Sequence, residues 1–186
     1  MENLLISACL LGVQCRYDGG SKPVMPTVAL MEQYHLIPIC PEQLGGLPTP
    51  REPSERRADA VVTKSGADVT AQFRRGAEQA LHLARLYGCT VIVLGRGSQG
   101  AAIYLRQTGE IYELPAVHTG PVVNTAGAGD ALFSAFVHYY AGGVPPLEAL
   151  ARAQVFASVK IGVSGAAKGF VDETTVEALY RAAAGR

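Results

Sequence analysis

The stretch Asn124-Thr125-Ala126-Gly127-Ala128-Gly129-Asp130 runs directly into the apolar segment 131–137, which favours a helix. A glycine-rich loop that enters a helix leaves several backbone N–H groups without partners, and the helix dipole adds partial positive charge there. Such a junction attracts an anion, and Gly127 and Gly129 let the backbone approach it closely. The stretch therefore predicts a phosphate-binding loop at the start of a helix.

Asp130 is the unusual member of this loop. A carboxylate beside a bound phosphate repels it, unless the carboxylate takes a proton from an attacking hydroxyl. Asp130 is therefore a candidate general base for phosphoryl transfer. The alternative is a helix start at which Asp130 only complements the helix dipole.

The segment as a whole resembles the C-terminal signature of the PfkB (ribokinase-like) small-molecule kinases. The resemblance covers the small residue before Thr125, the Gly-Ala-Gly-Asp core and the pair Ser134-Ala135 on the following helix. It implies that Asp130 is the catalytic base and that ATP and Mg²⁺ are the cofactors. It also implies an anion hole made of Thr125, Ala126, Gly127, Ala128 and Gly129.

The kinase resemblance continues on both sides of the signature. The turn Gly97-Ser98-Gln99-Gly100-Ala101 and the hairpin expected after it resemble a part of these kinases that lies near the nucleotide, and the region 154–166 corresponds to one that borders the adenine. The front part of such a kinase, which carries substrate recognition, is absent. A homo-oligomer or a partner chain would have to supply it. The resemblance implies nucleotide-binding roles for Gly97, Gly100, Gln154 and Gly165.

Two cysteines follow two short apolar runs near the start of the chain. Cys9 comes after the run 4–8, and Cys40 comes after the run 36–39. The carboxyl ends of neighbouring parallel strands lie at one edge of a sheet, where ligands collect. We therefore expect Cys9 and Cys40 to be able to face one shared crevice.

The residues around these cysteines resemble the thiouracil desulfurase family over roughly residues 1–88. The resemblance implies an iron–sulfur cluster held by three cysteines, with a Glu in acid–base work, and Cys9, Cys40 and Glu42 occupy matching positions. The matching segments are Ser7-Ala8-Cys9-Leu10-Leu11-Gly12, Cys15-Arg16-Tyr17-Asp18-Gly19-Gly20, Cys40-Pro41-Glu42 and Gly45-Gly46-Leu47-Pro48-Thr49-Pro50-Arg51.

The third cysteine of that family is missing. The family carries it in a Ser-Pro-Ser-Cys-Gly-like loop, where this chain reads Gly95-Arg96-Gly97-Ser98-Gln99-Gly100. Two thiolates are fewer than a cluster usually takes, so the sequence predicts no stable four-iron cluster in the isolated protein unless Cys15 or Cys89 replaces the missing ligand. The alternative is that Cys9 and Cys40 are two reduced thiols at strand ends.

Composition limits the partners. The 186 residues are 48% hydrophobic and carry 16 basic and 16 acidic side chains, so the formal net charge is zero. A chain without excess positive charge is not expected to bind nucleic acid or an anionic membrane surface. A small-molecule substrate fits better. No apolar run reaches the length of a membrane span, no signal peptide is recognisable, and no cysteines are paired as CxxC. We expect a cytoplasmic protein with reduced cysteines and with Cys89 buried.

Strand and helix patterns alternate along the chain. We expect helices near 26–34, 71–87, 146–163 and 174–183, and a buried parallel strand at 90–94. The predicted fold is a three-layer α/β open sheet, Rossmann-like or ribokinase-like, largely parallel, with helices on both faces. A desulfurase-like segment 1–88 and a kinase-like segment 89–186 would close as one sheet. A phosphotransferase ranks first, a cluster-dependent desulfurase second and a non-catalytic fusion remnant third.

Overall fold

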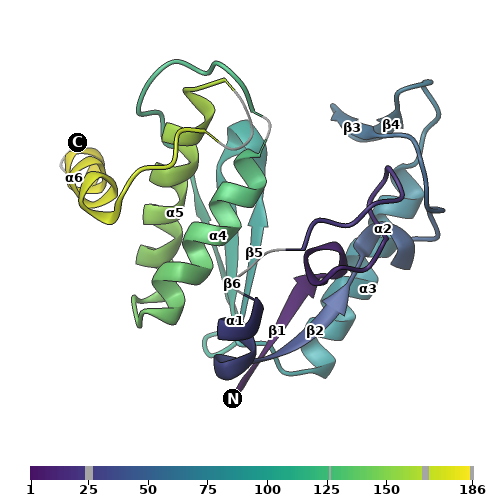
Figure 1. The fold of residues 1–186 in the computed structure, drawn as a ribbon, viewed down its shortest axis with the longest axis horizontal. Helices are drawn as coiled ribbons and strands as arrows, with labels where there is room; N and C mark the ends of the chain where they lie inside the picture. Colours follow the sequence, from purple (N-terminus) through teal and green to yellow (C-terminus); the bar gives the residue numbers. More distant parts are fainter. Residues whose placement is uncertain (24–26, 126, 165–167, 185–186) are drawn as a thin grey trace. The chain divides into compact units, whose positions relative to one another are not determined.

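The computed structural model describes residues 1–23, 27–125, 127–164 and 168–184. The chain divides into two compact units, residues 1–90 and 91–186, which are described separately below (Figure 1). Both units mix helices with small sheets, so the predicted α/β class is confirmed. The single, largely parallel open sheet is not what the described residues form. They form three small sheets, and only the sheet of β1 and β2 is parallel.

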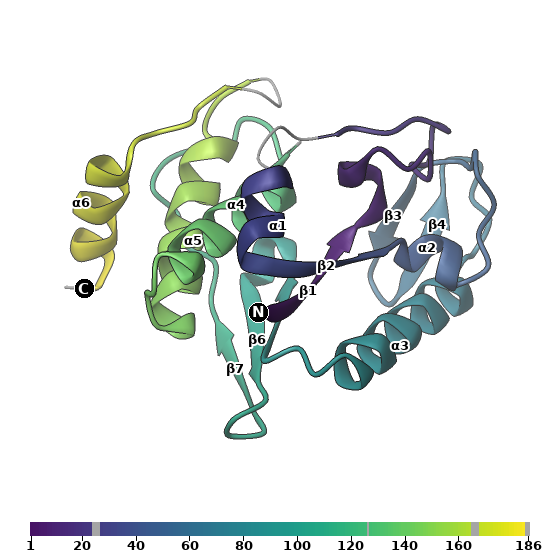
Figure 2. The ribbon, with the colours of Figure 1, turned by 60° about the horizontal axis from the view of Figure 1, so that its bottom comes forward.

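The parallel sheet of unit 1 contains β1 (Glu2–Ser7) and β2 (Tyr34–Ile39), with Ser7 paired with Ile39 at its end (Figure 2). A 3₁₀ turn (Ala8–Leu11) follows β1, and α1 (Thr27–Gln33) precedes β2. Because the strands are parallel, their carboxyl ends lie at the same edge. The strand arrangement that the shared crevice requires is therefore present.

Two glycines let the next two helices of unit 1 approach closely. The short α2 (Pro41–Leu44) lies against α3 (Thr70–Leu86). A Cβ atom added to Gly76 would lie 2.1 Å from the carbonyl oxygen of Pro41, and one added to Gly45 would be equally close to the backbone of α3. Gly45 and Gly76 thus fix the position of α2, which begins directly after Cys40.

The ends of α3 follow the sequence pattern in part. Gly88 has a φ of 66°, as expected for a glycine that ends a helix. Thr70, of a residue type that often serves as an N-cap, is instead the first residue of α3. Its hydroxyl is already engaged, because it accepts a hydrogen bond of 2.8 Å from the backbone N–H of Val61.

The second sheet of unit 1, a hairpin, was not anticipated. It joins β3 (Ser54–Arg57) to β4 (Ala60–Thr63) through Ala58, which has a φ of 50°. Tight hairpin turns are usually recognised in a sequence by Asn-Gly or Asp-Gly. This turn contains Ala58-Asp59 instead. The sequence therefore lacks the usual signal.

Unit 2 starts with an antiparallel sheet of β5 (Val91–Gly95), β6 (Ala101–Leu105) and β7 (Glu110–Leu114). The predicted parallel direction of the strand at 90–94 was wrong. A continuous apolar run indicates burial on both faces but not the direction of the neighbour, and the 3₁₀ turn Gly97–Gln99 is far too short for a parallel crossover. The expected hairpin between β6 and β7 is confirmed.

Three helices follow: α4 (Ala128–Ala141), α5 (Pro146–Ile161) and α6 (Glu173–Ala184). Helices α4 and α5 lie side by side (Figure 1). Ala149 and Ala153 on α5 have no exposed surface, so this face of the helix packs closely through small residues. Within the described ranges, no helix combines the length and the apolar character needed to cross a bilayer. The core of the unit consists of Ala101, Ile103, Leu132, Ala135, Phe136, Ala149, Leu150 and Ala153.

Candidate functional site

The first candidate site lies after the carboxyl ends of β1 and β2 in unit 1. The loop after β1 folds back, because the backbone N–H of Lys22 donates to the carbonyl of Cys9 at 2.9 Å. This return brings Cys15 to the start of α2, where the Cys40 thiol donates to the carbonyl oxygen of Cys15 at 3.7 Å. Cys15 is 1% exposed, whereas Cys9 and Cys40 are half-buried.

The three thiols influence one another electrostatically. Burial raises the pKa of the Cys15 thiol from its usual 9.0 to about 11, and the Cys40 and Cys9 thiols contribute to the rise. A negative charge on one sulfur disfavours a negative charge on the next. Three of the four thiols of the chain are therefore close enough to interact at this strand edge.

Arg51 ties the cysteine loops together. Its Nη1 and Nη2 atoms each donate to the carbonyl oxygen of Cys15 at 3.1 Å. Nη2 also lies 4.0 Å from the Cys40 sulfur and pairs with the carboxylate of Glu42. The backbone N–H of Arg51 donates to Tyr17 at 2.8 Å, which joins the 45–53 loop to the loop after β1.

The Arg51 guanidinium has one group that no neighbour satisfies. Its side chain is only 5% exposed. Among the buried side-chain nitrogen and oxygen atoms of the described residues, Arg51 Nε is the one with no hydrogen-bond partner. A buried donor without an acceptor costs about 1–3 kcal/mol, so this place favours a ligand that brings an acceptor.

The loop between Cys15 and Gly20 is held by its own polar residues. Arg16 donates to both carboxylate oxygens of Asp18, at 3.1 and 2.8 Å, and the N–H of Gly20 donates to the same carboxylate. These hydrogen bonds, with that from Arg16 first, hold the pKa of Asp18 below its usual range. The motif residues Cys15 to Gly20 thus form a compact turn that presents Cys15 to the strand edge.

The donor set at this edge is compatible with an iron–sulfur cluster. Three thiols, a nearby cation and an unsatisfied buried N–H suit a sulfide-containing anionic group. Among the described residues, no three His, Cys, Asp or Glu side chains are arranged to hold a single metal ion. A cluster needs a wider arrangement than a single ion does, because it binds each thiolate at a different iron.

Sequence reasoning overlooked Arg51 and underrated Cys15. Both lie inside the motif segments, where Arg51 received no role and Cys15 was considered only as a replacement for the missing third cysteine. A signal was available: a Pro-rich loop that ends in arginine, placed shortly after Cys40 and Glu42, can return a cation to the thiols. The roles of Cys9, Cys40 and Glu42 themselves stay predictions.

The second candidate site lies in unit 2, at the start of α4. Gly127 has a φ of 79° and the helix begins at the next residue. Thr125 accepts a hydrogen bond of 3.1 Å from Ala128 through its carbonyl, and Asp130 is exposed in the first turn. A Cβ atom on Gly129 would meet nothing within 4 Å, so the helix start is open on that side.

The end of β5 lies next to this helix start. A Cβ atom on Gly95 would lie 3.2 Å from Leu132 of α4. Gly97 is exposed in the following turn. Packing alone explains why position 100 is a glycine, since a Cβ atom there would lie 2.1 Å from the carbonyl oxygen of Leu114. Gln154 is 6% exposed within α5. Ala126 and Gly165, the other predicted members of the site, lie outside the described residues.

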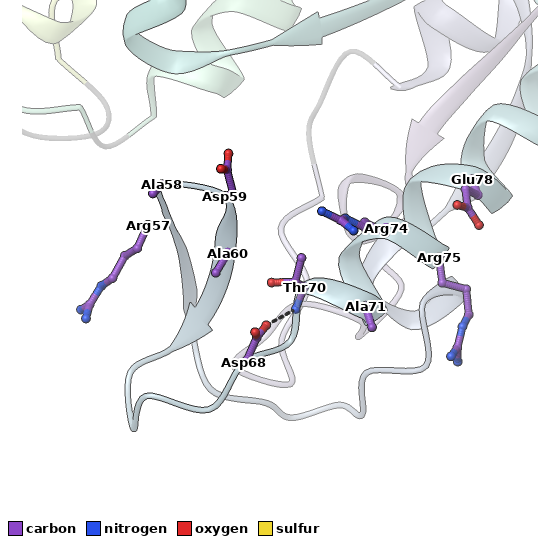
Figure 3. A pocket seen from close by; sticks show the side chains of 10 residues that line it. All are labelled: Arg57, Ala58, Asp59, Ala60, Asp68, Thr70, Ala71, Arg74, Arg75 and Glu78. Atoms are coloured by element: carbon purple, nitrogen blue, oxygen red, sulfur yellow. Dashed lines mark hydrogen bonds between the residues drawn. The ribbon is translucent and has the colours of Figure 1, made fainter.

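A third feature of the surface is a broad, open hollow of about 1030 Å³ in unit 1 (Figure 3). Its walls carry charges of both signs, and Asp68 accepts a hydrogen bond of 2.8 Å from the backbone N–H of Thr70. None of Cys9, Cys15 and Cys40 lines it. The hollow is therefore separate from the first candidate site, the thiol site, which consists of these three cysteines with Arg51 and Glu42. Its lining residues are Arg57, Ala58, Asp59, Ala60, Asp68, Thr70, Ala71, Arg74, Arg75 and Glu78.

The chain is similar to ribokinase-like kinases of known structure. The nucleoside kinase of Methanocaldococcus jannaschii, a member of the ribokinase family, matches with a TM-score of 0.52 and 20% identity. The match covers 60% of this chain and 37% of that kinase. At this identity the likeness concerns the fold alone, and the chain spans little more than a third of the kinase.

The chain is also similar to a second group of proteins. The uncharacterized protein YbbK of Bacillus subtilis (strain 168) is 33% identical over 105 residues, which cover 51% of this chain and 70% of YbbK. The structure of the [4Fe-4S]-dependent thiouracil desulfidase TudS matches with 43% identity and a TM-score of 0.47, over 62% of this chain and 80% of TudS. The model of the 2-thiouracil desulfurase family matches residues 4–138, beyond the front segment expected from the sequence. The chain belongs to the 2-thiouracil desulfurase family.

Proposed function

We propose that the thiol site of unit 1 removes sulfur from a thiocarbonyl nucleobase such as 2-thiouracil. One observation carries the proposal: Arg51 contacts the Cys15 carbonyl, the Cys40 thiol and the Glu42 carboxylate at once. It links Cys40 and Glu42, two of the three residues that the family resemblance singled out, to Cys15. This proposal reverses the ranking from sequence alone, because among the described residues no side chain links the members of the kinase site in a comparable way.

The cofactor of the proposed enzyme is an iron–sulfur cluster, with Cys9 and Cys40 among its ligands. TudS is named as [4Fe-4S]-dependent, and the donor types at the strand edge suit such a group. When bound, the cluster would supply an iron with an open position for the sulfur of the substrate. The cation of Arg51 offsets part of the negative charge that thiolates and sulfide bring to a half-buried place.

Glu42 is the proposed proton carrier. Replacing the C=S group of the substrate by C=O consumes one water and releases hydrogen sulfide. The attacking water must lose both of its protons on becoming the carbonyl oxygen, and the departing sulfur must gain two to leave as hydrogen sulfide. The Glu42 side chain is 33% exposed, so it can exchange protons with water, while Arg51 holds one of its oxygens. A positioned carboxylate of this kind is typically worth 10²- to 10⁴-fold in rate.

Incubation of the anaerobically reconstituted full chain with 2-thiouracil tests this proposal. We expect uracil and sulfide to form in equal amounts, and Glu42→Gln to lower the rate by at least 10²-fold with the iron content unchanged. Glu78→Gln is the matched control, since Glu78 is an exposed carboxylate on α3. A loaded protein that forms no uracil, or an equal loss of rate in both variants, would overturn the proposal.

The second candidate is the phosphotransferase module of unit 2. A specific observation favours it: α4 begins directly after a left-handed Gly127, with Asp130 exposed in its first turn. This arrangement is suited to an anion next to a general base. ATP and Mg²⁺ would be its cofactors, and a second copy or a partner chain would complete the acceptor side. Stabilisation of the full chain by Mg·ATP in a thermal melt would support it, and an unchanged melting temperature would count against it.

A further inference from the structure

We infer that Cys15 is the third thiolate ligand of the iron–sulfur cluster in this chain. The inference rests on the proposed function and concerns the ligand that the sequence lacks. The position expected for it reads Gly95-Arg96-Gly97-Ser98, so unit 2 offers no thiol there. The remaining candidates are Cys15 and Cys89, and the structure separates them.

Cys89 lies at the wrong end of the parallel sheet. Its thiol donates to the carbonyl oxygen of Asn3 at 3.4 Å, near the start of β1. Cys9 and Cys40 follow the opposite, carboxyl ends of the strands. A ligand set that includes Cys89 would have to span the length of β1, about 3.3 Å for each residue. Cys89 is therefore excluded as a partner of Cys9 and Cys40.

Cys15 lies where a third ligand is needed. Its carbonyl accepts hydrogen bonds from the Cys40 thiol at 3.7 Å and from Arg51 at 3.1 Å. Its N–H donates to Val13 at 2.9 Å, which fixes the backbone at this point of the loop. The backbone N–H of Lys22 donates to the Cys9 carbonyl, so the loop that carries Cys15 is hydrogen-bonded back to Cys9. Hydrogen bonds therefore connect this loop to both Cys9 and Cys40.

The unsatisfied group of Arg51 supports a ligand at the same place. The Arg51 side chain is 5% exposed, and its Nε–H has no partner among the described residues although its other two nitrogens are engaged with Cys15. A cluster sulfide or a cysteine thiolate next to the guanidinium would accept this hydrogen bond. Filling the site would thus satisfy the donor that the protein leaves open.

The test compares Cys15→Ser with Cys89→Ser after anaerobic reconstitution. We expect Cys89→Ser to retain the iron and acid-labile sulfide of the parent chain, because serine keeps the donor to Asn3. Cys15→Ser should lose most of its iron during gel filtration, or show a changed electron paramagnetic resonance spectrum after reduction. Circular dichroism of both iron-free variants verifies the fold, and Cys15→Ala is the substitute if Cys15→Ser is unfolded.

A measurement without variants uses the S–H stretching band in the infrared spectrum. The chain has four cysteines, all present as free thiols, and each ligand loses its proton to iron. Loading should remove three of the four S–H intensities and leave that of Cys89. Removal of only two, with full iron content, would overturn the inference and leave the proposed function standing. Absence of a cluster in the parent chain would instead overturn the proposed function.

Discussion

The Cys40 thiol donates a hydrogen bond of 3.7 Å to the carbonyl oxygen of Cys15. This contact joins residues 25 positions apart and links the loop after β1 to the start of α2. The Arg51 guanidinium strengthens the same link, since it contacts both partners. The thiol site therefore depends on the closure of two loops as well as on the parallel pairing of two strands.

Cys15 should be the slowest of the three site thiols to react with iodoacetamide in the iron-free protein. Only the thiolate reacts, and Cys15 combines 1% exposure with a pKa of about 11. At pH 8 we expect alkylation of Cys9 and Cys40 to precede that of Cys15 by at least tenfold in rate. Peptide mass spectrometry over time measures this order. Equal rates at all three sites would contradict the buried position of Cys15.

The iron-free protein should lose stability at alkaline pH through Cys15. Burial raises the pKa of this thiol in the folded state to about 11, from 9.0 for an ordinary cysteine. Below pH 9 both states keep the proton, and above it the unfolded state releases the proton first. The free energy of unfolding should therefore fall as the pH rises from about 9 to about 11. Urea titrations of the parent chain and Cys15→Ala measure the effect, which should be smaller in the variant.

Gly76→Ala should destabilise unit 1. Alanine favours a helix over glycine by about 1 kcal/mol, but its Cβ would lie 2.1 Å from the Pro41 carbonyl oxygen, which is backbone and cannot rotate away. We expect a net loss of about 1–3 kcal/mol, as for other overpacked sites. Gly129→Ala is the matched control, because its Cβ meets nothing within 4 Å in α4. Thermal unfolding should show a lower transition for Gly76→Ala alone.

Asp130→Asn tests the kinase candidate. If the chain has phosphotransferase activity, the variant should keep nucleotide binding or strengthen it, because a negative charge near the phosphates is removed. Turnover should fall by about 10²- to 10⁴-fold, the usual contribution of a general base. Thr125→Ala should have a smaller effect, and Asp59→Asn, an exposed aspartate of unit 1, should have none. Unchanged turnover in Asp130→Asn would make Asp130 a structural residue of the helix start.

The sequence predicted the elements with strong periodicity. Helix α3 has apolar residues at helical spacing and a glycine stop at Gly88, so its expected range 71–87 is close to the observed Thr70–Leu86. The parallel pair β1 and β2 followed from two apolar runs separated by room for a helix. These features are local, and local patterns are visible in one sequence.

The missed features depend on contacts between distant residues. The direction of β5 is set by the short turn to β6, and its apolar run carries no information on direction. The β3–β4 hairpin turns at Ala58 without glycine. In the thiol site, Cys9, Cys40 and Glu42 were found through their motif, whereas the roles of Arg51 and Cys15 emerge only when the two loops close. Spacing suggests that the loop carrying Arg51 can return to the thiols, but it does not fix which atoms such a closure joins.

The measurement that tests the account most directly is the iron and acid-labile sulfide content of the full chain after anaerobic reconstitution and gel filtration. With Cys9, Cys15 and Cys40 at the strand edge and Arg51 beside them, we expect close to four irons and four sulfides per chain, the content of one [4Fe-4S] cluster. The variant Arg51→Gln should retain less of both. Retention of less than one iron per chain in the parent protein, with the fold intact, would contradict the sulfur-handling site.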